Sequence, residues 1–378
     1  MHAKRTIAYY LCVLVVLAFA FFTNDFNLIN IQKTAIVTAI AIDKEEEFTL
    51  TAIIANPASQ GGSGGQGGGQ KSDAADGFAT VSGKGSTVAE ALENINAKTG
   101  WYPKLIFCRL LLLGEELCKG NVFDGLDYFL QNEYAADDCL LAATDGKASE
   151  LLSASPPLKA AVSEAMEKVL SDQSKRVGAV LTNTLRTFAI SYFSAGNSSY
   201  IPILKKTKEE GGDVFSASET ALFIKGKQVG ELDKDSTFAL ACVKNPLRLA
   251  SYTVESQGES SSLLVKNNRR KQKFSIEGDR PKMEIKLTVF ADLADRSQSQ
   301  NLDGLSGRAQ PSAVYAVAAE SLRAQIEKMF AYCKGIEFDA FDAIGKLQKY
   351  ENEHYERLKD SLIERLELSV SVEFKPIR

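Results

Sequence analysis

The sequence predicts an α+β fold, in which an N-terminal membrane anchor precedes about three mixed α/β domains with antiparallel and mixed sheets. An uncharged apolar segment near the N-terminus predicts the anchor, and β-branched runs that alternate with helical patterns predict the domains. A chain of 378 residues exceeds the roughly 250 that one hydrophobic core usually holds. We expect an anchor or signal at 1–24, an N-terminal domain at 25–198, a middle domain at 199–265 and a C-terminal domain at 266–378.

The composition limits the classes of function. The chain is 45% hydrophobic and 24% charged, as in an ordinary globular protein. Its net charge of -4 gives no overall basic field, so we expect no nucleic-acid partner. The sequence has only two histidines, His2 and His354, which restricts acid–base and metal chemistry.

The N-terminal segment has the pattern of a signal-anchor. Lys4 and Arg5 precede a run without charge from 6 to 22, and Asp25 follows it. Seventeen residues are at the short end of what crosses a core of about 30 Å. Basic residues before the run and an acid after it favour a cytoplasmic N-terminus and an extracytoplasmic body. Candidate anchor residues along this run are Thr6, Leu11, Val15, Leu17, Phe19 and Phe22.

Two alternatives for this segment stay open. Residues 18–20 fit the small-x-small pattern of signal peptidase, although Phe21 and Phe22 continue the apolar run and favour retention. Lipid attachment would need a cysteine at the end of the apolar run, whereas Cys12 lies in its middle. We therefore expect an uncleaved anchor.

The N-terminal domain begins with a hairpin, 33–43 and 47–56. Seven glycines then fall within 58–73, but no GK[ST] ending follows, so we expect a flexible loop and no phosphate site. Thr87 and Glu90 form a capping-box pattern before an amphipathic helix. The apolar run 105–113 is typical of a central strand. Further expected elements are a strand at 137–146 and helices at 121–131, 158–170 and 177–190.

The rest of the chain predicts a hairpin at 219–233 that turns at Gly226, a short helix at 234–246 and a strand meander ending near residue 295. Within the meander, five basic residues fall in 266–273. We consider a solvated turn between strands, or contact with anionic lipid headgroups; the residues are Lys266, Arg269, Arg270, Lys271 and Lys273. A long helix at 312–335, a shorter one at 338–350 and an alternating strand at 365–377 complete the chain.

The sequence contains no catalytic constellation. His354 lies in a charged helical stretch and is expected at the surface, and Glu115 and Glu116 diverge on a helix. The five body cysteines are widely spaced without a CxxC pair, which argues against zinc. Cys108 and Cys139 could meet if their strands are neighbours; otherwise they are buried inert thiols. We expect no enzyme activity, cofactor or metal.

The order of these segments resembles the Ger(x)C family, the C subunit of the nutrient germinant receptors of endospores. The resemblance covers roughly 33–376, and departs from the family pattern in lacking a lipobox cysteine, in the glycine-rich insert at 61–69 and at 242–250. The matching segments are "AIVTAIAID" (35–43), "GKGSTVAEALENI" (83–95), "LIFCRLLLLGEELCKGNVFDGLDYFLQ" (105–131), "AATDGKASELL" (142–152), "ALFIKGKQVGELD" (221–233) and "VKNNRRKQKFSIEGDRPKMEIKLTVFADLAD" (265–295).

The resemblance implies a non-enzymatic subunit of three mixed α/β domains, on the outer face of the spore inner membrane or cell membrane with integral-membrane partner subunits. It implies a role in assembly, scaffolding or signal coupling, transfers no catalytic residue and leaves germinant contact open. Two other classes remain as alternatives. A membrane-anchored solute-binding protein would have two similar doubly wound lobes, and a cell-wall hydrolase would need convergent acids roughly 5–10 Å apart.

Overall fold

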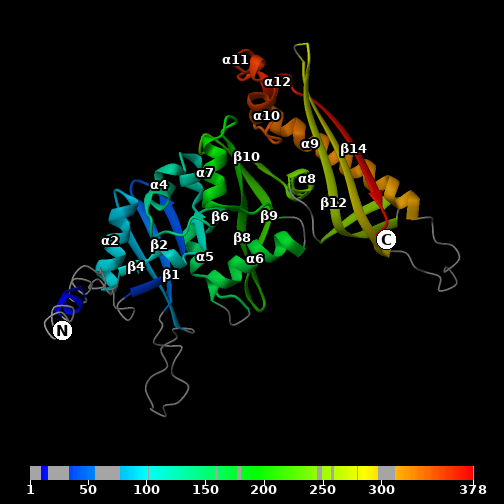
Figure 1. Cartoon of the computed structure of the whole chain (residues 1–378). Coiled ribbons are helices and arrows are strands. Elements are labelled where there is room, and N and C mark those ends of the chain that lie inside the picture. Colours follow the sequence, from blue (N-terminus) through cyan, green and yellow to red (C-terminus); the bar gives the residue numbers. More distant parts are fainter. Residues whose placement is uncertain are drawn as a thin grey trace, which may run out of the picture.

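The computed structural model describes residues 10–15, 34–55, 77–100, 102–157, 161–176, 180–244, 249–256, 259–278, 280–296 and 311–377 (Figure 1). These residues form a mixed α/β structure with two sheets. The glycine-rich segment 58–73 lies outside the described residues. Residues 199–265, the expected middle domain, contribute strands to both sheets, and the division into three domains stays a prediction.

The first sheet has the strand order β10-β9-β8-β6-β5-β1-β2-β3, with β4 paired to β1 and β7 to β6. Strands β1, β5, β6 and β8 run parallel at its centre, and antiparallel hairpins extend it on both sides. The bounds are β1 Thr34–Lys44, β2 Phe48–Ala55, β3 Phe78–Gly85, β4 Tyr102–Lys104, β5 Leu110–Leu113, β6 Leu140–Thr144, β7 Asn183–Thr184, β8 Ser198–Glu209, β9 Gly212–Ile224 and β10 Lys227–Leu232. The expected hairpins β1–β2 and β9–β10 are confirmed.

Helices cover both faces of this sheet. Alternate residues of a strand point to opposite faces, and all four leucines of β5 are buried. Leu111 and Leu113 pack with one set of helices, whereas Leu110 and Leu112 pack with α5 and α6 on the other face. The helix bounds are α2 Val88–Thr99, α3 Glu115–Lys119, α4 Phe123–Gln131, α5 Ala148–Leu152, α6 Val162–Arg176 and α7 Leu185–Phe193.

Local capping patterns set where the helices begin. The Thr87 side chain accepts the Glu90 N–H at the start of α2, as the sequence predicts, and the Glu90 carboxylate accepts the Ser86 N–H. Helices α6 and α7 begin later than expected. Thr184 caps α7 by accepting the Thr187 N–H, which places the helix start after the short strand β7.

The predicted strand 105–113 is wrong in its first half. Residues Leu105–Phe107 form a 3₁₀ turn, η4, and the strand β5 begins only at Leu110. The physical reason is the change of partner along β1, which pairs first with β4 and then, after a bulge, with β5. Residues 105–109 lie between these two pairings and leave the sheet, so the strand is shorter than the apolar run.

The second sheet has the order β11-β12-β13-β14 and also mixes directions, because β14 runs parallel to β13. The long helix α9 packs on one face through the predicted apolar stripe. The basic run 266–273 lies inside one strand of 19 residues, so the turn interpretation is wrong. The bounds are β11 Ala250–Ser256, β12 Glu259–Glu277, β13 Arg280–Arg296, β14 Glu367–Lys375 and α9 Pro311–Gly335.

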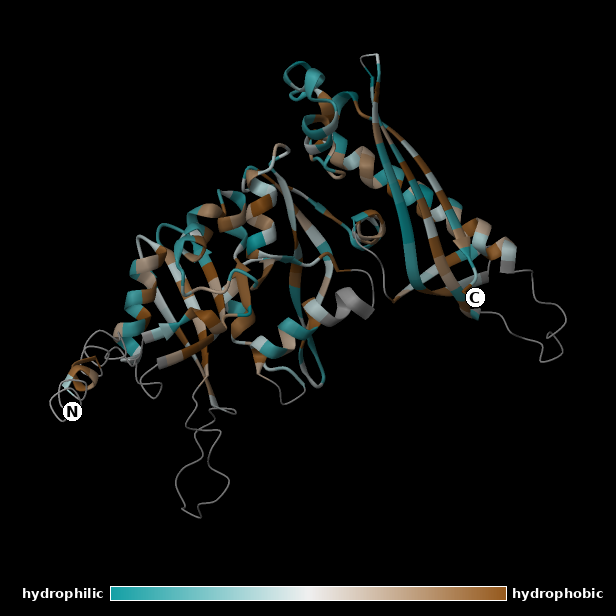
Figure 2. Cartoon of the chain, viewed as in Figure 1, coloured by the Kyte–Doolittle hydropathy of each residue, from teal (hydrophilic) through white to brown (hydrophobic). Residues whose placement is uncertain are grey.

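Helix α8, Lys234–Lys244, lies between the two sheets (Figure 1). The short helices α10 Ala343–Tyr350, η6 Asn352–His354, α11 Tyr355–Leu358 and α12 Leu362–Arg365 connect α9 to β14. Coloured by hydropathy, the helices and strands alternate apolar and polar positions, as expected of elements with one covered face (Figure 2).

Asp43, at the end of β1, connects this strand with the start of α5 and with the turn after β5. Its buried carboxylate accepts the N–H groups of Ala148 and Ser149 at 2.7 and 3.0 Å, and thereby caps α5. A side chain added at Gly114 would lie 2.3 Å from the Asp43 Oδ1 atom, so the turn after β5 needs glycine for close approach.

We predict that Asp43→Ala lowers the free energy of unfolding by about 2–4 kcal/mol, because two enclosed N–H groups lose their acceptor. Urea unfolding of the full chain in detergent measures the change. Asp124→Ala is the matched control, since Asp124 forms an exposed ion pair with Lys44 and its loss should cost at most about 1 kcal/mol. Equal losses in the two variants would contradict this role of Asp43.

Candidate functional site: the joint between the two sheets

Helix α8 is enclosed by both sheets. Its residues from Ser236 to Val243 are all buried, and it contacts β9 and β10 of the first sheet and α9 and β13 of the second. Leu222 and Leu232 of the first sheet belong to the same hydrophobic cluster as Leu263 and Leu287 of the second. A helix buried on all sides is a core element, and the hydrophobic cluster around α8 contains residues of both sheets, while the rest of the first sheet packs in two further clusters. We call this region the joint.

Strand β12 caps the C-terminal end of α8. The last carbonyls of a helix have no partner within it. The Asn268 Nδ2 atom donates to the Cys242 carbonyl at 2.7 Å, and Arg270 and Gln272 donate to the Val243 carbonyl. A guanidinium at this position is also favoured by the helix dipole. The Arg270 guanidinium therefore binds the end of α8 from the inner face of β12, although the residue keeps part of its surface exposed.

Lys244, the last residue of α8, brings a second cation into the joint. Its Nζ atom lies 5.6 Å from the ring centre of Tyr200 on β8. Lys244 keeps some exposure as a residue, but burial of its ammonium group lowers its pKa, while Asp339 and Asp342 raise it. Burial also raises the pKa of Tyr200 and lowers that of Arg270. The joint therefore holds charged groups that are only partly hydrated.

Asp339 links the region after α9 to the first sheet. Its buried carboxylate accepts the N–H groups of Ala343 and Ile344, both at 2.8 Å, at the start of α10. Its own N–H donates to the Ser198 hydroxyl at the start of β8, at 3.2 Å. Asp339 thus caps a helix with its carboxylate and connects to the first sheet with its backbone N–H.

A third connection runs from β10 to α9. The Tyr332 hydroxyl accepts the Glu231 N–H at 3.2 Å. A Cβ atom at Gly230 would lie 2.5 Å from the same hydroxyl oxygen and 2.9 Å from the Ile336 Cδ1 atom. The absence of a side chain at residue 230 is therefore required for the strand to approach the helix.

The chemistry of the joint is that of a structural connection. Its charged side chains bind helix ends and one another, and they do not line a cleft. One small cavity, about 90 Å³, lies elsewhere in the first sheet beside Glu115, Asp145, Lys205 and Glu231. It is far smaller than the usual 300–1,000 Å³ of a ligand pocket. The Lys205 ammonium there is paired with Glu219 at 2.7 Å, which raises the pKa of Lys205.

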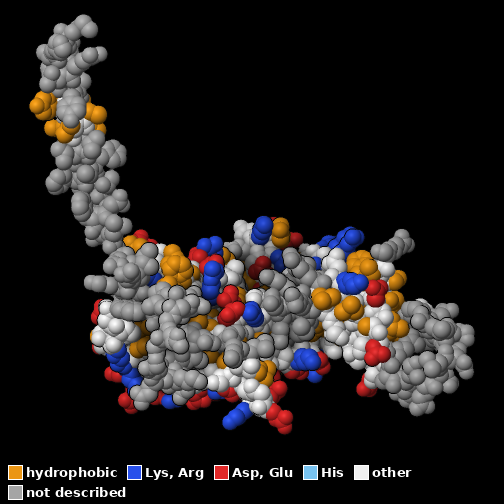
Figure 3. All heavy atoms as spheres, turned by 90° about the horizontal axis from the view of Figure 1, so that it is seen from below, with side chains coloured by type: hydrophobic (Ala, Val, Ile, Leu, Met, Phe, Trp, Pro, Cys, Tyr) orange, Lys and Arg blue, Asp and Glu red, His pale blue; other side chains and the backbone are white. Residues whose placement is uncertain are grey.

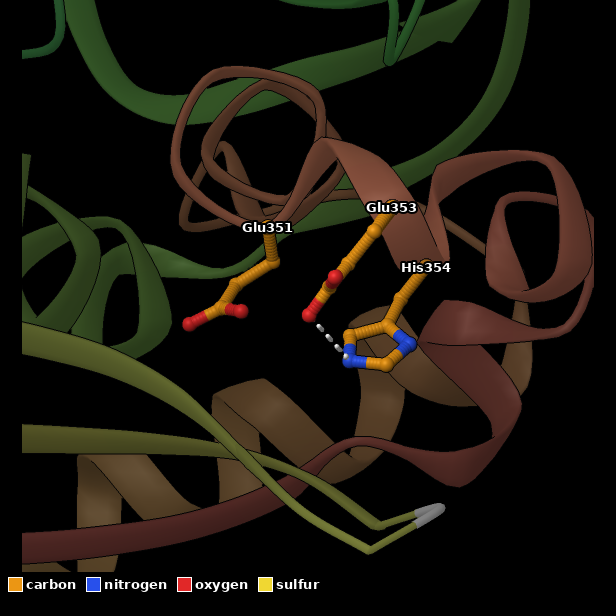
Figure 4. Close-up of side chains that lie close together, drawn as sticks. All are labelled: Glu351, Glu353 and His354. Carbon is orange, nitrogen blue, oxygen red and sulfur yellow. Dashed lines mark ion pairs between the residues drawn. The ribbon is translucent and has the colours of Figure 1, made fainter.

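One group of potential metal ligands lies outside the joint. The carboxylates of Glu351 and Glu353 lie near the imidazole of His354 (Figure 4), and the Glu353 Oε1 atom is 3.3 Å from the His354 Nε2 atom. The Glu353 side chain is largely exposed, and the other imidazole nitrogen contacts Arg357. Exposed acidic groups of this kind are common without a metal ion, and the group carries no metal assignment.

The body cysteines are buried free thiols. Burial raises the pKa of Cys108, Cys118 and Cys333 to about 12, which leaves them protonated and unreactive at neutral pH. Cys139 is close enough to Cys108 that the two interact electrostatically, and its pKa is also raised, mainly by burial. The interpretation as buried inert thiols is confirmed.

The structure divides the five basic residues of β12. All four of Arg269, Arg270, Lys271 and Lys273 are exposed, but Arg269, Lys271 and Lys273 share the outer face of the sheet, whereas Arg270 lies on the inner face and is paired in register with the buried Leu287. Lys286 of β13 is paired with Lys271 in the strand register and adds a fourth cation to that face. Lys266 lies beside a bulge and pairs with Asp292 at 3.3 Å. We call Arg269, Lys271, Lys273 and Lys286 the outer basic face.

The described residues include part of the predicted anchor. Leu11 and Val15 lie in the helical stretch 10–15, where both side chains are exposed. Thr6, Leu17, Phe19 and Phe22 lie outside the described residues. Among the residues that the structure describes, we find no helix with the length and apolar character needed to cross a bilayer.

Comparison with protein families identifies the class of protein. Residues 27–206 match the model described as the spore germination protein N-terminal domain, and residues 218–378 match the spore germination B3/GerAC-like C-terminal model. The chain therefore belongs to the GerAC-like family of spore germination proteins, which confirms the resemblance inferred from its sequence.

A solved structure supports the same fold. The crystal structure of the GerBC protein aligns with a TM-score of 0.53 and 17% sequence identity, over 90% of this chain and 97% of the GerBC chain. No curated protein matches the chain. At this identity the structural likeness concerns the arrangement of the two mixed sheets alone.

The sequence did not reveal the joint. It predicts α8 as a short helix, but a pattern of apolar residues does not show which sheets enclose it. One signal was present: residues 238–243 are apolar without interruption, as in a helix covered on all sides. The inward Arg270 had no such signal, because its neighbours in the sequence are also basic.

We predict that Gly230→Ala lowers the free energy of unfolding by about 1–3 kcal/mol, because its methyl group collides with the Tyr332 hydroxyl. Tyr332→Phe alone should cost less than about 1 kcal/mol, since water can replace the lost acceptor for the exposed Glu231 N–H. In the double variant, Tyr332→Phe should recover part of the Gly230→Ala loss.

Urea unfolding of the four proteins measures this coupling. Gly335→Ala is the control glycine variant, because a Cβ atom there meets nothing within 4 Å. If the two losses simply add, β10 and α9 are not in contact as the structure has them.

Proposed function

We propose that the chain is the non-catalytic extracytoplasmic subunit of a nutrient-responsive germination receptor complex, acting in assembly, scaffolding or signal coupling. Membership of the GerAC-like family along both halves of the chain supports the receptor assignment. The joint supports the structural role, because a shared core holds the two halves in a fixed arrangement. The partners would be integral-membrane subunits of the same complex.

We further propose that residues 6–22 anchor the body to the outer side of the membrane and that the outer basic face contacts anionic lipid headgroups. Cations near an anionic surface are attracted within about a Debye length. The exposed side chains of Lys271 and Lys273, with Lys286 opposite, support this contact. Arg270 is left out, because it caps α8.

The alternative class, a solute-binding protein, finds less support. It would need two similar doubly wound lobes around a cleft. Within the described residues, the two sheets differ in strand order and direction, and helix α8 fills the space between them.

Dipicolinate release from nutrient-treated spores tests the receptor proposal. A strain without this chain should lose release for at least one nutrient, and the full-length gene should restore it. A gene lacking residues 1–24 should fail to restore it, because the body would leave the membrane. Normal release for every nutrient, with no other receptor able to compensate, would refute the proposal and move the solute-binding class to first place.

The same strain tests the outer basic face. Lys271→Gln/Lys273→Gln should slow release if headgroup contact contributes, whereas Lys225→Gln/Lys227→Gln removes the same charge from the exposed β9–β10 turn and should not. Equal effects of the two variants, at equal protein levels by immunoblot, would refute headgroup contact by this face.

A further inference from the structure

The turn η4 exposes two large apolar side chains. Ile106 is 54% and Phe107 is 51% exposed, although both belong to a run that otherwise fills the core. The turn itself is firmly held, because Leu105 and Cys108 on either side are buried and the Cys108 N–H donates to the Leu105 carbonyl at 2.9 Å. The apolar pair is thus presented to solvent by a fixed backbone.

The pair lies at the end of the first sheet where β1 begins. Strand β4, just before η4, pairs with the first three residues of β1, and the Arg109 N–H donates to the Thr38 carbonyl. Tyr134, 59% exposed, lies in the loop leading to β6, whose first residue donates its N–H to the Arg109 carbonyl. Seen from below, hydrophobic side chains reach the surface among both basic and acidic side chains (Figure 3).

The length of the chain before β1 keeps this end of the sheet close to the predicted anchor. Residues 23–33 separate the apolar run 6–22 from Thr34. Eleven residues reach at most about 40 Å even when fully extended. With 6–22 in a bilayer, the start of β1 and the neighbouring η4 turn are therefore held near the membrane surface.

We propose that the Ile106–Phe107 turn inserts into the interface of the bilayer that holds the N-terminal segment. This inference rests on the anchor in the proposed function. A tethered chain needs little additional affinity for a second contact, because the tether keeps the local concentration high. Two large apolar side chains on a rigid turn supply that contact.

Charged side chains at this end of the sheet contribute less to membrane contact than the apolar pair does. Lys104 and Arg109 flank the apolar pair, at positions suited to headgroup phosphates. The neighbouring loop also carries the acidic residues Glu133 and Asp138, which offset this positive charge. Asp137 on the same loop is paired with Arg186 at 2.7 Å. We therefore expect insertion in both zwitterionic and anionic bilayers, led by the apolar pair.

Fluorescence quenching in nanodiscs tests the insertion. Trp101 is the single tryptophan of the sequence, so Trp101→Phe/Phe107→Trp places one fluorophore on the turn of the full-length chain. The control is Trp101→Phe/Phe193→Trp. Phe193 is 74% exposed and lies beside Phe123 at the opposite end of the sheet. Brominated lipids should quench the first variant at least about threefold more than the second.

Equal quenching of the two variants would overturn the proposal. A second measurement avoids reliance on Trp101→Phe: lipids with a photoreactive acyl chain should label the peptide around η4 in the unmodified chain, and Ile106→Ser/Phe107→Ser should abolish that labelling. Absence of labelling, with protection of η4 only when integral-membrane partner subunits are added, would assign the turn to a protein contact instead. Loss of the chain from the nanodiscs in a salt wash would instead refute the anchor, as a separate readout.

Discussion

The burial of α8 on all sides is the constraint on which the rest of the structure depends. A helix with eight consecutive buried residues must be enclosed, and here the first sheet covers one side and the second sheet with α9 covers the other. Its C-terminal carbonyls then need donors, which β12 supplies through Asn268 and Arg270. The same enclosure leaves the charged groups of Lys244 and Asp339 only partly hydrated. It also brings Gly230 into close contact with Tyr332.

The joint fixes the arrangement of the two sheets, which is what the proposed scaffolding role requires. The cavity beside Glu115 and Lys205 is about 90 Å³, well below ligand size, and burial raises the pKa of the buried thiols. What the structure does provide is a fixed relation between two sheets with different exposed surfaces. The second sheet carries the outer basic face, and the first sheet presents the apolar η4 turn. A GerAC-like subunit of this construction can hold two contacts at a constant separation.

Local patterns in the sequence predicted much of the fold, because their causes are local. The hairpins β1–β2 and β9–β10, the Thr87 cap and the α9 stripe follow from alternation, turn residues and helical spacing. Failures occurred where distant partners decide the outcome. The run 105–113 changes direction because β1 exchanges β4 for β5, and the basic run of β12 remains a strand because β13 pairs along all of it.

The candidate site was the least predictable part, since the contacts that connect the two sheets at the joint join residues far apart in the sequence. Arg270 shows this most clearly. In the sequence it is one of three consecutive basic residues, but the pleat places it on the face of β12 that binds the end of α8 and its two neighbours on the opposite face. Only knowledge of the face that α8 covers separates a helix cap from a surface charge.

Pulsed thiol labelling during urea unfolding tests the shared core most directly. Cys118 lies in the first sheet's core and Cys333 in α9, and both are buried in the native chain. If α8 unites the two sheets, the two thiols should become reactive at the same urea concentration. Exposure of Cys118 and Cys333 at clearly separate midpoints would show two independent cores and contradict the account.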